Sequence, residues 1–161
     1  MRCRCLLTLE AESGSHIKPE ADYQTVASGY ETNGWSEQAH ATKYIDDMVA
    51  AFSEVDIVIC RAGATSTAEL IAAGKASIMI PFPFAADDHQ RKNAEAMAAA
   101  GAAKMILQQE LSAQRLADEI KALVNEPERL TSMEQAARNL SRGDAAAKVV
   151  DLVEETVNSK R

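Results

Sequence analysis

Three short apolar runs recur along the middle of the chain, and the first of them is rich in β-branched residues. They cover residues 55–60 (VDIVIC), 76–80 (ASIMI) and 103–107 (AKMIL). Runs of this length that lack strict polar alternation are typical of strands buried on both faces. Because stretches with helical spacing separate the runs, we expect a parallel sheet in which each strand reaches the next through a helix.

Turn and capping signals bound the intervening helices. Asp46 and Asp47 suit the start of a helix that continues over 48–52, because acidic side chains favour a helix N-terminus. Gly74 and Gly101 are expected to end two later helices, Gly101 as a left-handed cap, and Ser112 is expected to cap the start of another. The helices predicted after the first run are 67–73, 90–100, 113–124, 127–139 and 144–157.

The amino-terminal part of the chain has weaker signals. Residues 1–22 show no clear period and are interpreted as an unassigned leader. A short helix is predicted from Asp22 to Tyr30, and a strand from His40 to Tyr44. The ordered domain is therefore expected to span residues 23–158.

Composition narrows the class of protein. The chain has 161 residues, of which 47% are hydrophobic and only 4% aromatic, so one core packed through small alanine contacts is expected. The net charge of -7 disfavours a nucleic-acid partner. No run of about 18 apolar residues is present to span a membrane, and the three cysteines lack metal-ligand spacing. These features predict a cytoplasmic protein with reduced thiols and no metal site.

The segment that follows the first apolar run has the composition of a phosphate-binding turn. Gly63 permits a tight turn, and Ala64, Thr65 and Ser66 offer small side chains and backbone N–H donors at a helix entry. Arg61 could face a phosphate or be bonded to a neighbouring carboxylate or carbonyl. This chemistry suits a diphosphate ligand, while the absence of the glycine fingerprints of dinucleotide enzymes and P-loop ATPases disfavours those two classes.

Glu69 allows two interpretations. The residues from Ser66 to Glu69 match a capping box, in which the serine and glutamate side chains satisfy backbone N–H groups at a helix start. A carboxylate at this place can also accept hydrogen bonds from two ribose hydroxyls. The pattern alone leaves both interpretations open.

His89, Gln90 and Asn93 form a second polar group, at the start of the helix predicted over 90–100. Gln90 and Asn93 are three residues apart and so share one face. The structural interpretation is a solvent-exposed polar turn. The functional interpretation is recognition of sugar hydroxyls or an acetamido group, because amide side chains supply a donor and an acceptor together.

The whole stretch from Tyr44 to Ala103 resembles the carboxyl-terminal domain of MurG-type transferases, which belong to the GT-B fold glycosyltransferases. The shared motifs occur in order: Ile-Asp-Asp-Met, Arg-x-Gly-Ala, a Glu five residues after that Ala, Pro-Phe, Gln-x-x-Asn-Ala and Gly-Ala-Ala. The resemblance implies a Rossmann-like α/β fold, with helices on both faces of a parallel sheet. It also implies that residues 23–158 are a partial nucleotide-sugar-binding domain, the carboxyl-terminal half of the GT-B fold, incomplete at its N-terminus.

The same resemblance implies roles for individual residues. The backbone of Ile45 would contact uracil, Ala64 to Ser66 would hold phosphate, Glu69 would bind ribose and Gln90 would contact N-acetylglucosamine. The family commonly has paired glutamines where this chain has His89 and Gln90. The complete set implied for the UDP-sugar is Ile45, Ala64, Thr65, Ser66, Thr67, Ala68, Glu69 and Gln90, with Met48, Arg61, Gly63, His89 and Asn93 as further candidates.

The family reaction implied is inverting transfer of N-acetylglucosamine from UDP to a lipid-linked muramyl-pentapeptide, at the cytoplasmic face of the inner membrane, with no cofactor or metal. In the family, an amino-terminal domain carries the acceptor-binding site and the catalytic base, and the first strand of this half is followed by a Gly-rich phosphate loop. Neither is found in residues 1–44. Three hypotheses follow: a donor-binding portion of such a transferase, the donor subunit of a split two-subunit enzyme, or a non-catalytic fragment. An uncovered sheet edge would favour dimerisation.

Overall fold

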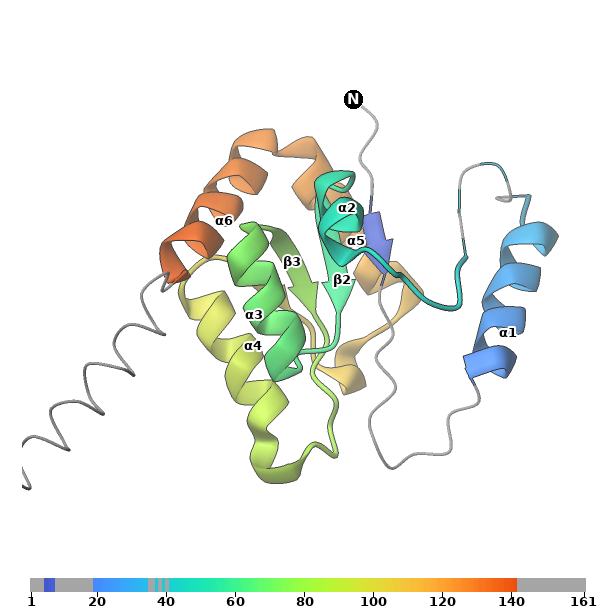
Figure 1. Cartoon of the computed structure of the whole chain (residues 1–161), viewed down its shortest axis with the longest axis horizontal. Coiled ribbons are helices and arrows are strands. Elements are labelled where there is room, and N and C mark those ends of the chain that lie inside the picture. The colour runs from blue at the N-terminus through green and yellow to red at the C-terminus, as the bar shows by residue number, and fades with distance from the viewer. Residues whose placement is uncertain (1–4, 8–18, 35–36, 38, 40, 142–161) are drawn as a thin grey trace, which may run out of the picture.

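The computed structural model describes residues 5–7, 19–34, 37, 39 and 41–141, and within them the chain forms a four-stranded parallel sheet (Figure 1). The strands lie side by side in chain order: β1 (Cys5–Leu7), β2 (Ile57–Cys60), β3 (Ala76–Met79) and β4 (Ala103–Met105). In register, Ile57 lies opposite Ala76, and Ser77 opposite Ala103. The parallel sheet and its three predicted strands are confirmed.

Helices connect the strands and cover both faces of the sheet. In Figure 1, α3 and α4 lie on one side of the sheet and α5 on the other, while α1 stands apart from the sheet. Two short 3₁₀ turns, η1 (Ala86–Asp88) and η2 (Gln108–Glu110), follow β3 and β4. The helices are α1 (Pro19–Thr32), α2 (Met48–Ser53), α3 (Ala64–Ala73), α4 (His89–Ala99), α5 (Ala113–Asn125) and α6 (Pro127–Leu140).

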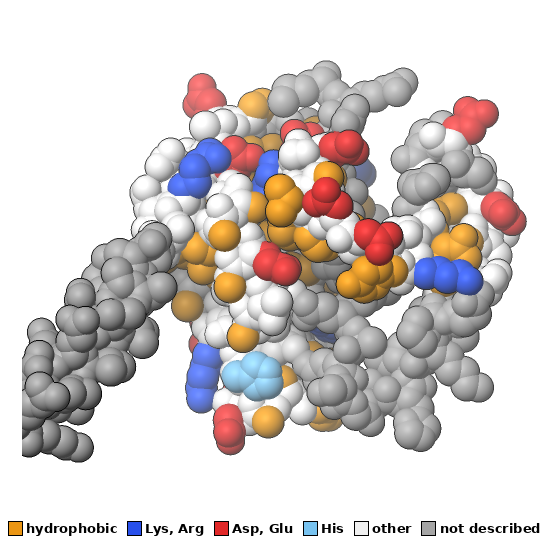
Figure 2. Space-filling view, viewed as in Figure 1, with side chains coloured by type: hydrophobic (Ala, Val, Ile, Leu, Met, Phe, Trp, Pro, Cys, Tyr) orange, Lys and Arg blue, Asp and Glu red, His pale blue; other side chains and the backbone are white. Residues whose placement is uncertain are grey.

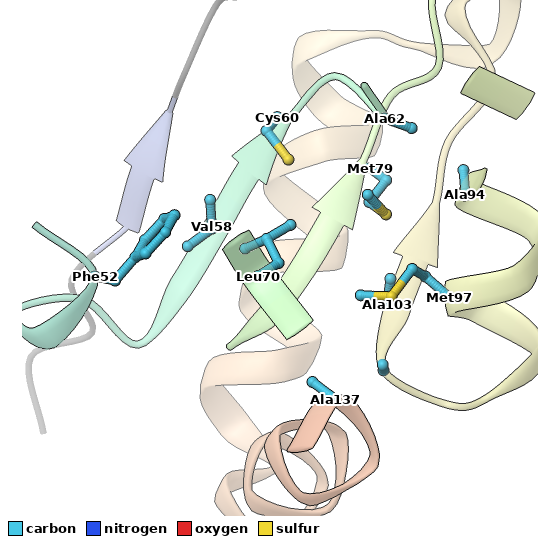
Figure 3. Close-up of a cluster of buried hydrophobic side chains, with 11 residues drawn as sticks. Phe52, Val58, Cys60, Ala62, Leu70, Met79, Ala94, Met97, Ala103 and Ala137 are labelled. Carbon is cyan, nitrogen blue, oxygen red and sulfur yellow. The ribbon is translucent and has the colours of Figure 1, made fainter. Parts of the chain in front are cut away.

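The strands divide their side chains between two hydrophobic clusters. Alternate residues of a strand point to opposite faces, so Val58 and Cys60 enter one cluster while Ile57 and Ile59 enter the other. Figure 3 shows the first cluster, where Leu70 of α3 lies over the sheet. Small side chains let helices approach closely there, as the composition predicts. The alanines of this cluster are Ala62, Ala94, Ala102, Ala103 and Ala137.

The helix ends predicted at Asp47, Gly74, Gly101 and Ser112 are confirmed. Gly74 has φ 62° and Gly101 φ 79°, both in the left-handed region that glycine adopts without steric cost. Asp47 accepts a hydrogen bond from the Ala50 N–H at 2.9 Å. Ser112 likewise caps α5 by accepting one from the Arg115 N–H at 3.1 Å.

Several amino-terminal predictions differ from the structure. The segment 1–22, expected to be an unassigned leader, contains β1 and the first residues of α1; its boundary at residue 22 stays a prediction. The strand predicted over 40–44 is wrong for 41–44, which form a loop without a pairing partner among the described residues. β1 pairs along β2, so the strand predicted over residues 55–60, which is β2, does not lie at the edge of the sheet. Dimerisation stays a prediction, and the helix predicted over 144–157 lies outside the described residues.

Candidate functional site

The loops that leave the carboxyl ends of β2, β3 and β4 meet at one edge of the sheet. Arg61, in the first of these loops, forms hydrogen bonds with the other two. Its Nη1 donates to the Ile80 carbonyl at 3.1 Å and to Gln108 Oε1 at 2.7 Å. Its guanidinium also lies 5.7 Å from the centre of the Phe82 ring. The interpretation of Arg61 as bonded to a neighbouring carbonyl is therefore confirmed, and a contact of Arg61 with phosphate stays a prediction.

Helix α3 begins three residues earlier than predicted. Gly63 is its N-cap, with φ -61° and ψ 155°, and Ala64 is the first helical residue. Ser66 therefore lies inside the first turn, 8% exposed, and does not cap the helix. The capping-box interpretation of Ser66 and Glu69 is wrong, because both glycine and serine serve as N-caps and the chain uses the glycine.

The amino-terminal end of α3 presents open backbone donors. No side chain in the described part of the chain caps this end. The Thr67 N–H bonds to the Gly63 carbonyl at 2.9 Å, and Thr67 Oγ1 donates to the same oxygen at 2.7 Å. The N–H groups of Ala64 and Thr65, both exposed residues, have no partner within the described part of the chain. Unpaired N–H groups and the positive end of the helix dipole together form a place for an anion.

Glu69 lies on the second turn of α3. It is half-buried, and within the described residues its carboxylate makes no hydrogen bond or ion pair. At 1.5 Å of rise per residue, Glu69 stands about 7.5 Å along the axis from Ala64. A carboxylate held at the surface without a protein partner keeps its acceptor capacity for another molecule.

Gln90 and Asn93 do not form the exposed polar turn that was one interpretation. Gln90 is only 2% exposed, and its Oε1 accepts a hydrogen bond from the Phe82 N–H at 2.9 Å. Asn93 is half-buried, and its Nδ2 donates to the Ala62 carbonyl at 3.0 Å. Both amides therefore fasten α4 to the loops that follow β2 and β3. A sugar contact by Gln90 stays a prediction.

The turn before α4 was not foreseen. Asp87 and Asp88 have φ angles of 51° and 55°, in the left-handed region that non-glycine residues rarely adopt. His89 is exposed and its Nδ1 lies 2.6 Å from the Ala86 carbonyl, while Lys92 Nζ donates to the Asp87 carbonyl at 2.9 Å. The signal in the sequence was the Asp-Asp pair, since aspartate tolerates this conformation better than most residues.

Ile45 and Met48 lie before and at the start of α2, and both are half-buried. Met48 packs against the first hydrophobic cluster. No hydrogen bond among the described residues joins Ile45 to the start of α3. The uracil contact expected of Ile45 stays a prediction.

A shallow groove of about 510 Å³ runs between α3 and α4 and brings three of the sequence-derived candidates together. Thr67, Ala68 and Asn93 line it, next to apolar side chains that include Ile71 and Met97. Glu69, Gln90 and His89 do not line it. The groove is therefore a neighbour of the α3 N-terminus and not the same feature.

The described residues contain no group of three His, Cys, Asp or Glu side chains placed to hold a metal ion. In the same part of the chain, no helix is both long and apolar enough to cross a membrane. Figure 2 shows acidic side chains gathered around α2, among hydrophobic ones. This surface does not resemble the basic patch of a nucleic-acid-binding face.

Comparison with known proteins decides the family. Residues 11–154 match the glycosyltransferase family 28 C-terminal domain. The chain belongs to this family. The crystal structure of Acinetobacter baumannii MurG superimposes with a TM-score of 0.75 at 29% identity, covering 96% of this chain and 50% of that one. A glycosyltransferase of kitacinnamycin, 18% identical, shares the fold with a TM-score of 0.62 over 96% of this chain and 43% of its own.

Two curated relatives are each named UDP-N-acetylglucosamine–N-acetylmuramyl-(pentapeptide) pyrophosphoryl-undecaprenol N-acetylglucosamine transferase. The Citrifermentans bemidjiense protein is 47% identical over 84% of this chain, and the Myxococcus xanthus protein 46% identical over 85%. The chain spans 37% and 35% of the lengths of these two relatives. The resemblance to MurG-type transferases, with the Rossmann-like GT-B fold, is confirmed.

Proposed function

We propose that this chain binds UDP-N-acetylglucosamine at the carboxyl edge of its sheet and acts as the donor-binding part of a peptidoglycan N-acetylglucosaminyltransferase. The observation that carries the proposal is that, within the described residues, no side chain caps the N-terminus of α3 and the Glu69 carboxylate has no partner. The names of the curated relatives supply the donor and the acceptor, a lipid-linked N-acetylmuramyl-pentapeptide.

In the proposed complex the UDP diphosphate lies at the first turn of α3. The N–H groups of Ala64 and Thr65 donate to its oxygens, and the helix dipole stabilises their charge. Gly63 lets the backbone approach closely, because no side chain stands between the chain and the ligand. The separation of about 7.5 Å between Ala64 and Glu69 along the helix leaves room for the ribose beside the carboxylate.

The same contacts support the reaction chemically. As the glycosidic bond breaks, negative charge grows on the UDP leaving group, and donors already aimed at the diphosphate offset that charge in the transition state. A base must also take the proton from the acceptor hydroxyl. We assign that base and the acceptor to an amino-terminal half or a partner subunit, at the cytoplasmic face of the inner membrane. The mechanism requires no metal or cofactor.

The donor proposal is tested by calorimetric titration of the folded 161-residue chain with UDP-N-acetylglucosamine and UDP-glucose. Glu69→Gln removes the negative charge while keeping the size of the side chain. We expect it to weaken UDP-sugar binding by roughly tenfold, as expected for loss of a charged hydrogen bond. Glu128→Gln, an exposed position in the first turn of α6, is the matched control. If Glu69→Gln and Glu128→Gln bind the UDP-sugar with equal affinity, Glu69 does not contact the ligand.

The assembly state is tested separately. Affinity purification from cells should show whether a membrane-associated acceptor-binding subunit accompanies the chain. Its recovery would favour a split two-subunit transferase over a donor-binding portion of one longer enzyme. Folded chain that binds no UDP-sugar would instead favour a non-catalytic fragment.

A further inference from the structure

The Ala62 carbonyl, in the loop between β2 and α3, is held by a side chain of α4. Asn93 Nδ2 donates to it at 3.0 Å, and only the nitrogen end of an amide can donate to a carbonyl. Ala62 is fully buried, and its carbonyl accepts no backbone N–H among the described residues. Because the residue is shielded from water, Asn93 is the group that satisfies this carbonyl within the described structure.

This bond fixes the direction of the next N–H group along the chain. The described residues contain no cis peptide bond, so the Ala62 carbonyl and the Gly63 N–H lie on opposite sides of one planar peptide group. The carbonyl points to Asn93 on α4, and the Gly63 N–H therefore points away from that side chain. Gly63 is half-buried, and its N–H has no partner in the described part of the chain. Gly63 thus carries a directed, open donor.

The two donors that follow Gly63 are directed in another way. The Gly63 carbonyl accepts the Thr67 N–H at 2.9 Å and Thr67 Oγ1 at 2.7 Å, so by the same planar geometry the Ala64 N–H points out of the helix start. Ala64 and Thr65 are the first helical residues, whose N–H groups have no partner inside an α-helix. The helix itself directs these two donors, whereas the direction of the Gly63 N–H depends on a side chain from another helix.

We propose that the Gly63 N–H is a third donor to the diphosphate, and that Asn93 is the positioning residue that directs it without contacting UDP or the sugar. This inference rests on the proposed function, because it concerns the same diphosphate site at the start of α3. N–H bonds to charged oxygens are strong, and a donor whose direction is already set costs less to order on binding. Without Asn93 the Ala62–Gly63 peptide group rotates to find another partner for its carbonyl, and the Gly63 N–H turns away from the ligand.

The first test follows single amides of the labelled full-length chain by nuclear magnetic resonance. In the wild type, the amides of Gly63, Ala64 and Thr65 should all shift on addition of UDP and hardly at all on addition of uridine, which lacks the diphosphate. Asn93→Leu keeps the size of the side chain but removes the donor, so the Gly63 shift at saturating UDP should be largely lost while the Ala64 shift remains. An unmoved Gly63 amide in the wild type, or a full Gly63 shift in Asn93→Leu, would overturn the inference.

The second test measures the consequence for affinity. Asn93→Leu should weaken binding of UDP and of UDP-N-acetylglucosamine by the same factor, roughly tenfold for one bond to a charged group, and leave uridine within about twofold of wild type. Ser112→Ala is the matched control: it also removes one hydrogen bond of a helix start, to the Arg115 N–H at 3.1 Å, but on α5. It should leave all three affinities unchanged.

Two results of this test would overturn the positioning role of Asn93. A loss confined to UDP-N-acetylglucosamine would show that Asn93 contacts the sugar directly. An equal loss for uridine and UDP would show that Asn93 supports the fold in general and not the diphosphate donor.

The amide titration of the wild-type chain also separates this inference from the proposed function, even where the variant does not fold. If the amides of Gly63, Ala64 and Thr65 all stay unmoved at saturating UDP, the proposed function fails and the role of Asn93 fails with it. If Ala64 and Thr65 shift and Gly63 does not, the proposed function stands and only the third donor is rejected.

Discussion

The amide of Gln90 is expected to be a main support of the loop after β3. It is 2% exposed, and its Oε1 accepts the Phe82 N–H at 2.9 Å. Replacement by methionine keeps the length and volume of the side chain but removes the acceptor, so the Phe82 N–H loses its partner. Leaving a backbone donor unpaired away from water costs about 1–3 kcal/mol. That is a substantial part of the 5–15 kcal/mol by which domains of this size are typically stable.

The measurement is urea unfolding followed by circular dichroism. Gln90→Met should lower the free energy of unfolding by about 1–3 kcal/mol with an unchanged denaturant slope, because the native surface is preserved. Gln109→Met is the control, since Gln109 is an exposed glutamine in η2 with no hydrogen bond among the described residues. If Gln90→Met stays within about 0.5 kcal/mol of wild type, as surface changes do, the bond does not support the loop.

Two further substitutions probe the sheet and a helix end. Ser77→Ala should raise the free energy of unfolding by about 1 kcal/mol, because the Ser77 hydroxyl is fully buried without a partner in the described structure; a lowered value would reveal a partner. Gly74→Ala should lower the melting temperature by several degrees, since Gly74 has φ 62° and a Cβ there would collide with Arg138. Gly34→Ala, at φ 71° with open space around it, isolates the backbone contribution.

The sheet was predictable because its central strands are short apolar runs that are easily recognised in the sequence. β2 and β3 are short runs buried on both faces, and glycines mark the ends of α3 and α4. β1 was not predictable, since three residues carry no period and its pairing with β2 joins segments about fifty positions apart. The start of α3 was missed because Gly63 and Ser66 are both acceptable N-caps three residues apart, and local sequence does not choose between them.

The place of the candidate site in the fold could be predicted from the sequence, but the contacts made by its individual residues could be predicted only in part. The segment 63–69 was placed correctly at the end of β2, where parallel sheets bind ligands. Gln90 was misjudged by the interpretation of an exposed turn, because polar residues at a helix start usually face water and its partner at Phe82 exists only in the fold. The left-handed turn at Asp87 and Asp88 had a sequence signal only in the two aspartates, which tolerate that conformation, while the bonds from His89 and Lys92 to the turn are seen only in the structure.

The central claim, a diphosphate at the start of α3, is tested most directly by nuclear magnetic resonance. Backbone amides of the labelled 161-residue chain are assigned and titrated with UDP and, in parallel, with uridine, which lacks the diphosphate. The account predicts that the amides of Ala64 and Thr65 shift strongly with UDP and hardly at all with uridine. Unmoved amides at saturating UDP, or equal shifts with both ligands, would contradict it.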